Sequence, residues 1–70
     1  MAKTTVVNRI RELRFMRGQI TQADLAEQVG VSRQTIVAIE KAKYSPSLEL
    51  AFKISAVFGE PVDEVFWVEG

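Results

Sequence analysis

QADLAEQVGVSRQTIVAIEKAK, residues 22–43, is the stretch that decides the fold of this 70-residue chain. Its pattern predicts one helix over Gln22–Gln28 and a second over Arg33–Lys41. Gly30 follows the first helix, and glycine takes the left-handed backbone conformation that ends a helix at little cost. Ser32 precedes the second helix and can accept a hydrogen bond from its free amide groups. The sequence therefore predicts two short helices joined by a tight turn.

The second helix has two dissimilar faces, because successive residues step by about 100°. One face carries large apolar and polar side chains, Thr35, Ile36, Ile39 and Glu40, and the other carries Arg33, Gln34, Val37, Ala38 and Lys41. Arginine can donate two hydrogen bonds to guanine, glutamine can pair with adenine, and valine or alanine can touch a thymine methyl group. The alternative is an ordinary amphipathic helix with a polar outer face. Ala26, a small side chain where the two helices must cross, favours a helix-turn-helix over residues 22–41.

Four motifs carry a resemblance to a known family: TQADLA (21–26), GVSRQTI (30–36), IE (39–40) and KYSPSL (43–48). They resemble the Cro/C1-type (Xre) helix-turn-helix regulators over about residues 6–66. The resemblance implies an all-α, five-helix lambda-repressor-like DNA-binding domain. Two departures stand out: the segment 17–22 is one residue longer than the family's Arg-Gly-Leu-Thr-Gln, and Lys41-Ala42 replaces Asn-Gly after the second helix. The first changes a turn, and the second bears on the backbone conformation at that point.

The resemblance also implies roles for individual positions. The expected contacts to DNA bases are Ser32, Arg33, Gln34, Val37 and Ala38, and the expected phosphate contact is Gln22, at the N-terminus of the first of the two helices. Charge and position add Lys41 and Lys43 as phosphate contacts.

A further pair is expected to be structural. In the resembled family an arginine of the first helix pairs with the glutamate after the recognition helix, and Arg14 and Glu40 match these positions. An unpaired carboxylate beside Ile36 and Ile39 would be costly to bury. A bidentate ion pair would fix the two helices against each other without any part in catalysis.

Composition narrows the function classes. The chain has no Cys and no His, which excludes disulfides, cysteine or histidine metal sites and a histidine base, so we expect no metal and no cofactor. Asp24, Glu27 and Glu40 form no recognisable catalytic pair, which disfavours an enzyme. No apolar run approaches the roughly 20 residues of a membrane span, and the chain does not open on a signal peptide. We expect a single cytoplasmic domain over residues 1–70.

The net charge is zero, but the charges are unevenly distributed. Residues 1–48 hold eight Lys or Arg against four Asp or Glu, whereas residues 49–70 hold one against five. A basic half joined to an acidic half suits a protein that presents one side to a polyanion, although chance segregation is an alternative in so short a chain.

The remaining elements are expected at Asn8–Arg17, Leu48–Phe58 and a one-turn helix over Pro61–Val65. Both chain ends read as strands, Thr4–Val7 and Phe66–Val68, which would pair in a two-stranded ribbon or, alternatively, fray. Residues 61–68 are the expected dimerisation element. The apolar run proposed for the interface is Val65, Phe66, Trp67 and Val68.

These observations favour a homodimeric repressor. Its two recognition helices would enter successive major grooves of double-stranded DNA, about 34 Å apart, on a near-palindromic operator. The alternatives are an antitoxin or a protein-interaction module that uses the same fold. The sequence names neither the operator nor an inducer, and no small-molecule ligand is evident.

Overall fold

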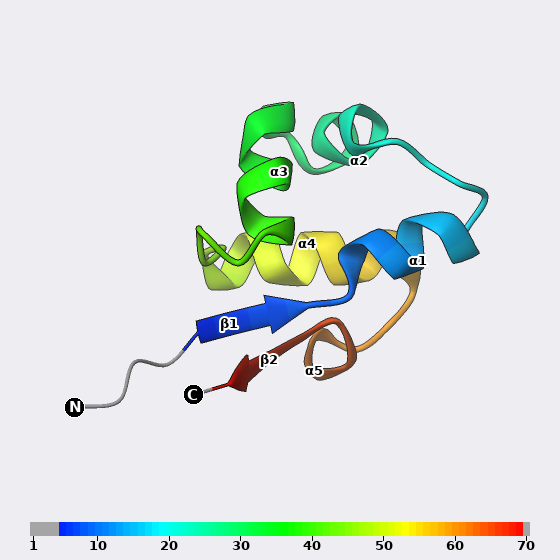
Figure 1. Ribbon diagram of the computed structural model, residues 1–70. Helices are drawn as coiled ribbons and strands as arrows, with labels where there is room; N and C mark the ends of the chain where they lie inside the picture. Colours follow the sequence, from blue (N-terminus) through cyan, green and yellow to red (C-terminus); the bar gives the residue numbers. More distant parts are fainter. Residues whose placement is uncertain (1–4, 70) are drawn as a thin grey trace.

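The computed structural model describes residues 5–69. Five helices and two strands follow one another: β1 (Thr5–Asn8), α1 (Ile10–Met16), α2 (Gln22–Val29), α3 (Arg33–Glu40), α4 (Leu48–Phe58), α5 (Val62–Val65) and β2 (Phe66–Glu69) (Figure 1). The five expected helices are confirmed, with ends that differ by at most two residues. Thr4, where the first strand was expected to begin, lies outside the described residues.

The helix α4 runs through the centre of the molecule. The helices α2 and α3 lie on one side of it, and the ribbon and α5 lie on the other (Figure 1). The core consists of apolar side chains from all five helices and from β2, and those that are fully buried are Ile10, Leu13, Leu25, Ile36, Ile39, Ile54 and Val65. This core fixes the position of the helix-turn-helix relative to the rest of the chain.

Side-chain caps explain where the central helices begin. Thr21 and Asp24 form a capping box on α2, in which each side chain accepts a hydrogen bond from the other residue's backbone amide. The Thr21 amide, and secondly its hydroxyl, hold the pKa of Asp24 below its ordinary value. Ser32 caps α3 and Ser47 caps α4 through bonds to the third amide of each helix.

Among residues 5–69, the backbone turns left-handed at two residues that are not glycine. In the longer turn before α2, Gln19 has φ of 57° directly after Gly18. After α3, Ala42 has φ of 59°, so alanine takes the conformation that asparagine-glycine sequences adopt easily. The amide of Ala42 donates to the carbonyl of Ile39 at 2.9 Å, and that of Lys43 to Ala38 at 2.9 Å. These bonds close α3 despite the missing glycine.

The two strands form an antiparallel ribbon, in which Val6 is opposite Val68 and Val7 is opposite Trp67. The ribbon expected at the chain ends is therefore confirmed for the described residues, and fraying of these segments is not observed.

The apolar run that was expected at a dimer interface is half buried and half exposed in the structure. Val65 is fully buried and Phe66 is 8% exposed, and both belong to the protein's own core. Trp67 and Val68 are 41% and 62% exposed. The expectation that Val65 and Phe66 face a partner needs correction, because their side chains are already buried in the core of their own subunit.

Candidate nucleic-acid interface

The core orients α3 so that one of its faces is open to solvent. Ile36 and Ile39 are buried, while Arg33 and Gln34 are exposed in the first turn. The Ser32 hydroxyl before this turn accepts from the Thr35 amide at 3.2 Å and lies 3.0 Å from its hydroxyl oxygen. The residues that were expected to contact bases therefore begin at a capped, well-defined helix end.

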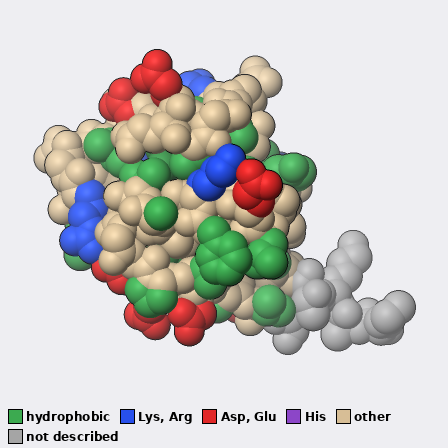
Figure 2. Space-filling view, turned by 180° about the vertical axis from the view of Figure 1, so that it is seen from behind, with side chains coloured by type: hydrophobic (Ala, Val, Ile, Leu, Met, Phe, Trp, Pro, Cys, Tyr) green, Lys and Arg blue, Asp and Glu red, His purple; other side chains and the backbone are tan. Residues whose placement is uncertain are grey.

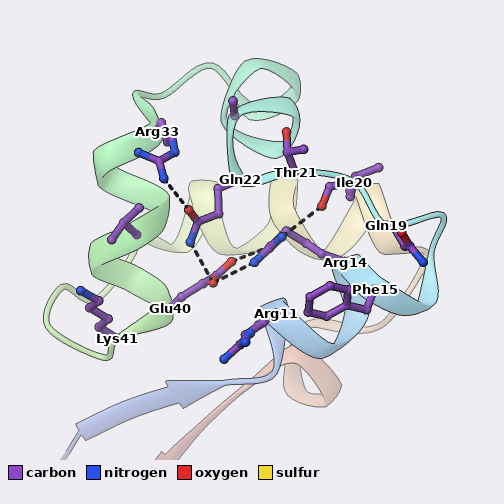
Figure 3. Close-up of a pocket in the computed structure, with 12 residues that line it drawn as sticks. Arg11, Arg14, Phe15, Gln19, Ile20, Thr21, Gln22, Arg33, Glu40 and Lys41 are labelled. Atoms are coloured by element: carbon purple, nitrogen blue, oxygen red, sulfur yellow. Dashed lines mark hydrogen bonds and ion pairs between the residues drawn. The ribbon is translucent and has the colours of Figure 1, made fainter.

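Two adjoining hollows bring the expected DNA-contacting residues together. The first lies between α1, α2 and α3 (Figure 3). The second follows the outer face of α3. Their linings share Gln22, Arg33, Val37 and Lys41, and the second adds Gln34, Ala38 and Lys43. Seven of the eight expected residues thus border one continuous surface, and the eighth, Ser32, precedes Arg33 in the chain.

Among the described residues, the cations that pair with carboxylates and those that do not lie mostly on different parts of the surface. Away from these hollows, Arg9, Arg17 and Lys53 each pair with a carboxylate. Among residues 5–69, the cations that form no ion pair with a carboxylate of these residues are Arg11, Arg33, Lys41 and Lys43, and all four line the two hollows. Within the part of the chain that the structure describes, positive charge that is not neutralised is therefore concentrated on this face.

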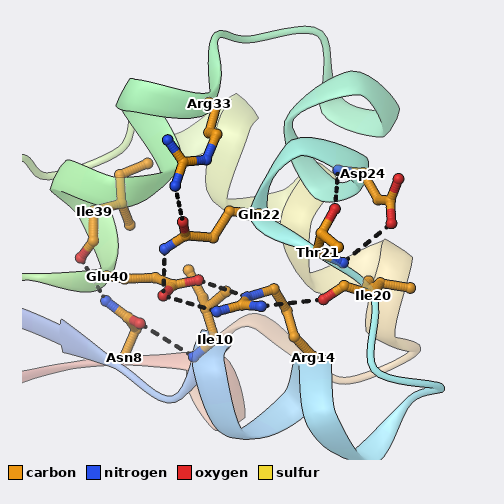
Figure 4. Close-up of polar contacts among 10 residues, drawn as sticks. All are labelled: Asn8, Ile10, Arg14, Ile20, Thr21, Gln22, Asp24, Arg33, Ile39 and Glu40. Carbon is orange, nitrogen blue, oxygen red and sulfur yellow. Dashed lines mark hydrogen bonds and ion pairs between the residues drawn. The ribbon is translucent and has the colours of Figure 1, made fainter.

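The carboxylate that borders the same surface, Glu40, is held by Arg14. Nε of Arg14 lies 2.8 Å from Oε2 of Glu40, and Nη2 donates to Oε1 at 3.2 Å. A third bond runs from Nη1 of Arg14 to the carbonyl of Ile20 at 3.1 Å. The side chains of the pair are only 10% and 9% exposed (Figure 4). This bidentate contact joins α1 to the end of α3 and neutralises the glutamate.

Gln22 extends these contacts to the first turn of α3. Its Nε2 donates to Oε1 of Glu40 at 3.2 Å, and its Oε1 accepts from Nη2 of Arg33 at 3.2 Å (Figures 3 and 4). A residue expected to touch phosphate is thus bonded to a residue expected to read a base.

Comparison with known proteins identifies the family. The helix-turn-helix family model matches residues 10–65, which includes all five helices. The chain belongs to the helix-turn-helix family. Its relatives include an uncharacterized HTH-type transcriptional regulator of Methanocaldococcus jannaschii, MJ0272, 52% identical over 62 residues that cover 89% of this chain and 92% of the relative. YgzD of Bacillus subtilis, another HTH-type transcriptional regulator, is 50% identical with the same coverage.

The chain is also similar to a phage repressor and to a candidate DNA-binding protein of known structure. The cryptic phage CTXphi transcriptional repressor RstR of Vibrio cholerae is 36% identical over 58 residues, which are 83% of this chain and 51% of RstR. A solved structure of a candidate DNA-binding protein from Bacteroides fragilis superimposes with a TM-score of 0.77 at 29% identity, covering 89% of this chain and 98% of the other. The family consists of DNA-binding transcriptional regulators and not of enzymes. None of the helices within residues 5–69 could cross a membrane.

The structure adds Arg11 and Phe15 to this helix-turn-helix surface. Both line the first hollow, and the guanidinium carbon of Arg11 lies 5.9 Å from the centre of the Phe15 ring. Arg14 lies 5.7 Å from the same ring, which is 56% exposed. The sequence contained one signal for this pair, since residues four apart on a helix are neighbours and Arg11 has no acidic residue four positions on.

Proposed function

We propose that this protein is a sequence-specific DNA-binding transcriptional regulator of the repressor type, with α3 lying in the major groove. The observation that carries the proposal is the location of the four unneutralised cations. Arg11, Arg33, Lys41 and Lys43 lie around the outer face of α3, whereas Arg14 is neutralised by Glu40 and the other described cations, Arg9, Arg17 and Lys53, pair with carboxylates elsewhere. A surface of this kind attracts the phosphates on both sides of a groove.

The first turn of α3 supplies the proposed base readers. Arg33 and Gln34 are exposed and carry the side chains that pair with guanine and adenine. Val37 and Ala38 follow on the same face and suit thymine methyl groups. Ser32 is an exposed residue at the N-terminus of α3, from which its hydroxyl can reach a phosphate or a base edge.

Four residues are proposed to contact the DNA backbone. Gln22 is the first residue of α2, where free backbone amides and the helix dipole favour a phosphate. Lys41 and Lys43 lie beyond the end of α3, and Arg11 lies on α1 across the first hollow. These contacts would hold the recognition helix at a fixed depth and angle in the groove.

We further propose that the protein acts as a homodimer on a near-palindromic operator. Trp67 and Val68 of β2 leave a large part of their apolar surface exposed, and a second copy related by a two-fold axis would cover one or both of these side chains. Hydrophobic side chains also gather on the side opposite to that of Figure 1 (Figure 2). Leu48 and Phe52 of α4 are exposed too, and residues four apart on a helix form one surface. That second apolar surface is the specific observation in favour of a protein-interaction module, the alternative function.

Selection of bound sequences from a random pool of DNA duplexes tests the proposal. The expected product is an inverted repeat whose half-sites are about 34 Å apart, and a promoter carrying it should be less active when the protein is present. A matched selection with Arg33→Ala and Gln34→Ala combined should lose the consensus. Recovery of unrelated sequences by the wild type would contradict specific recognition and favour the protein-interaction alternative.

A further inference from the structure

A chain of hydrogen bonds connects the core to the first turn of α3. Glu40 accepts two bonds from Arg14 and a third from Nε2 of Gln22. The carbonyl oxygen of the same Gln22 amide accepts from Arg33, whose side chain is exposed. Four side chains from α1, α2 and α3 therefore link a buried ion pair to a guanidinium at the surface (Figure 4).

The side-chain amide of Gln22 can form both of its hydrogen bonds in only one of its two orientations. A carboxylate paired with arginine only accepts hydrogen bonds, and a guanidinium only donates them. The NH2 group of Gln22 must therefore face Glu40, and its oxygen must face Arg33. The reversed amide would place NH2 against the guanidinium and oxygen against the carboxylate, so that both 3.2 Å contacts would be lost. Glu40 thus determines that Gln22 offers an acceptor to Arg33.

This acceptor leaves Arg33 free to read a base. A guanidinium group has five N–H donors, the bond to Gln22 uses one, and a guanine edge takes two. A long side chain that is held in place before DNA arrives loses less conformational freedom on binding, which corresponds to about two- to twelvefold in affinity. The same restraint excludes guanidinium orientations that would suit other bases.

We propose that Glu40 is a positioning residue, which orients the amide of Gln22 and through it holds Arg33 for base reading. The effect on DNA recognition rests on the proposed function. The hydrogen-bonded chain, by contrast, is a property of the free protein and can be measured without DNA.

Two sets of substitutions cut this chain at different links without leaving a buried charge. Gln22→Met keeps the length of the side chain and removes both of its hydrogen bonds. Arg14→Met combined with Glu40→Leu replaces the ion pair by apolar side chains, a change that is often neutral or stabilising for buried pairs. Gln28→Met is the matched control, since Gln28 is exposed at the other end of α2.

The first measurement is the order parameter of the Arg33 Nε–H bond, obtained by 15N relaxation on the free protein. Both Gln22→Met and the Arg14→Met/Glu40→Leu variant should lower it, and Gln28→Met should leave it unchanged. Equal order of Arg33 in the wild type and in Gln22→Met would overturn the proposal, whatever the stability of the double variant.

The second measurement is the ratio of affinities for the best and the worst base at the operator position that Arg33 reads. This ratio should fall by about two- to twelvefold in both sets of variants, and no further when they are combined. Loss of a phosphate contact by Gln22 would weaken all operators together and leave the ratio unchanged.

Two outcomes separate this proposal from the proposed function. A folded Arg14→Met/Glu40→Leu variant that keeps the wild-type ratio and an ordered Arg33 would show that Glu40 is structural only, and would leave DNA recognition intact. A wild type without any base preference, in which Arg33 is nevertheless ordered through Gln22, would overturn the proposed function and not the positioning of Arg33.

Discussion

Arg14 and Glu40 are 26 positions apart in the sequence, and their side chains meet at 2.8 Å between α1 and the end of α3. Both are about nine-tenths buried, and within residues 5–69 no buried side-chain nitrogen or oxygen lacks a hydrogen-bond partner. Removal of one member of this pair should cost more stability than removal of one member of a surface ion pair. The reason is burial, since the remaining charge would have neither water nor a counter-ion.

Substitution of Arg14 by alanine should therefore destabilise the fold strongly. We expect a loss of roughly 3–5 kcal/mol in the free energy of unfolding, a large share of the 5–15 kcal/mol typical of a whole domain. Urea unfolding measures the loss. Lys53→Ala is the control, because it removes an exposed ion pair with Glu49, which solvent screens and which should contribute little to stability. Similar losses in the two variants would contradict the packing described for Glu40.

Arg33→Ala should weaken binding to the preferred operator by about 1–3 kcal/mol and relax base preference at one position. The physical reason is that a bidentate contact from a guanidinium distinguishes guanine from the other bases. Titrations against operators carrying each of the four bases at every half-site position measure the effect. A loss of equal size on every sequence would instead assign Arg33 to a phosphate.

Lys43→Ala and Arg11→Ala should both behave in the opposite way. Each would weaken all DNA sequences about equally and lower the slope of log affinity against log salt by about 1, because one fewer counterion is released. Lys53→Ala should leave the slope unchanged, since this lysine lies on α4 and pairs with Glu49. An unchanged slope in Arg11→Ala would remove α1 from the interface.

Ala42→Gly should stabilise the protein, although it deletes a methyl group. Ala42 has φ of 59°, a conformation that costs an L-residue about 1–2 kcal/mol and costs glycine little. We expect a net gain of about 1 kcal/mol, or a rise of about 4–8 °C in the melting temperature. Ala56→Gly, in the exposed interior of α4, should lower stability by about 0.5–1 kcal/mol. A decrease of stability in both variants would show that Ala42 is not strained.

Local signals in the sequence were enough to predict the helices. Gly30 and Ser32 mark helix ends by their own conformational and hydrogen-bonding preferences, so α2 and α3 were expected within one residue of their observed bounds. The longest helix, α4, was expected with the bounds that it has. Such signals act over a few residues and depend little on the rest of the fold.

Features that depend on three-dimensional neighbours were predicted less well. The apolar run at the C-terminus did not reveal that Val65 and Phe66 would be buried in their own subunit. Their burial depends on core side chains from other helices, which the local sequence does not show. The bond between Gln22 and Arg33 joins two positions 11 apart and depends on the carboxylate of Glu40. The sequence contained each of these residues but not the distances between them.

The exposed end of β2 leads to the last prediction, which concerns assembly. Trp67 and Val68 are neighbours on a strand, so their side chains point to opposite faces of the ribbon. In a two-fold dimer each interface residue occurs once in each subunit, so two copies of its side chain are buried. Burial of one side chain of this size contributes about 1.5–3 kcal/mol to the free energy of association. The Trp67→Ser/Val68→Ser variant should therefore raise the dissociation constant of the dimer by at least about tenfold.

Sedimentation equilibrium of the wild type and of this variant measures that change, and circular dichroism should show the same helical content for both. The two substitutions keep the backbone of β2 paired with β1, whereas deletion of the strand would also remove Phe66 from the core. The single substitutions then identify which face of the ribbon the partner covers. Dissociation by Leu48→Ser/Phe52→Ser, with no effect of Trp67→Ser/Val68→Ser, would move the interface to α4. A wild type that is monomeric at tens of micromolar, where a dimer of about micromolar Kd would be mostly assembled, would end the dimer proposal and with it the palindromic operator.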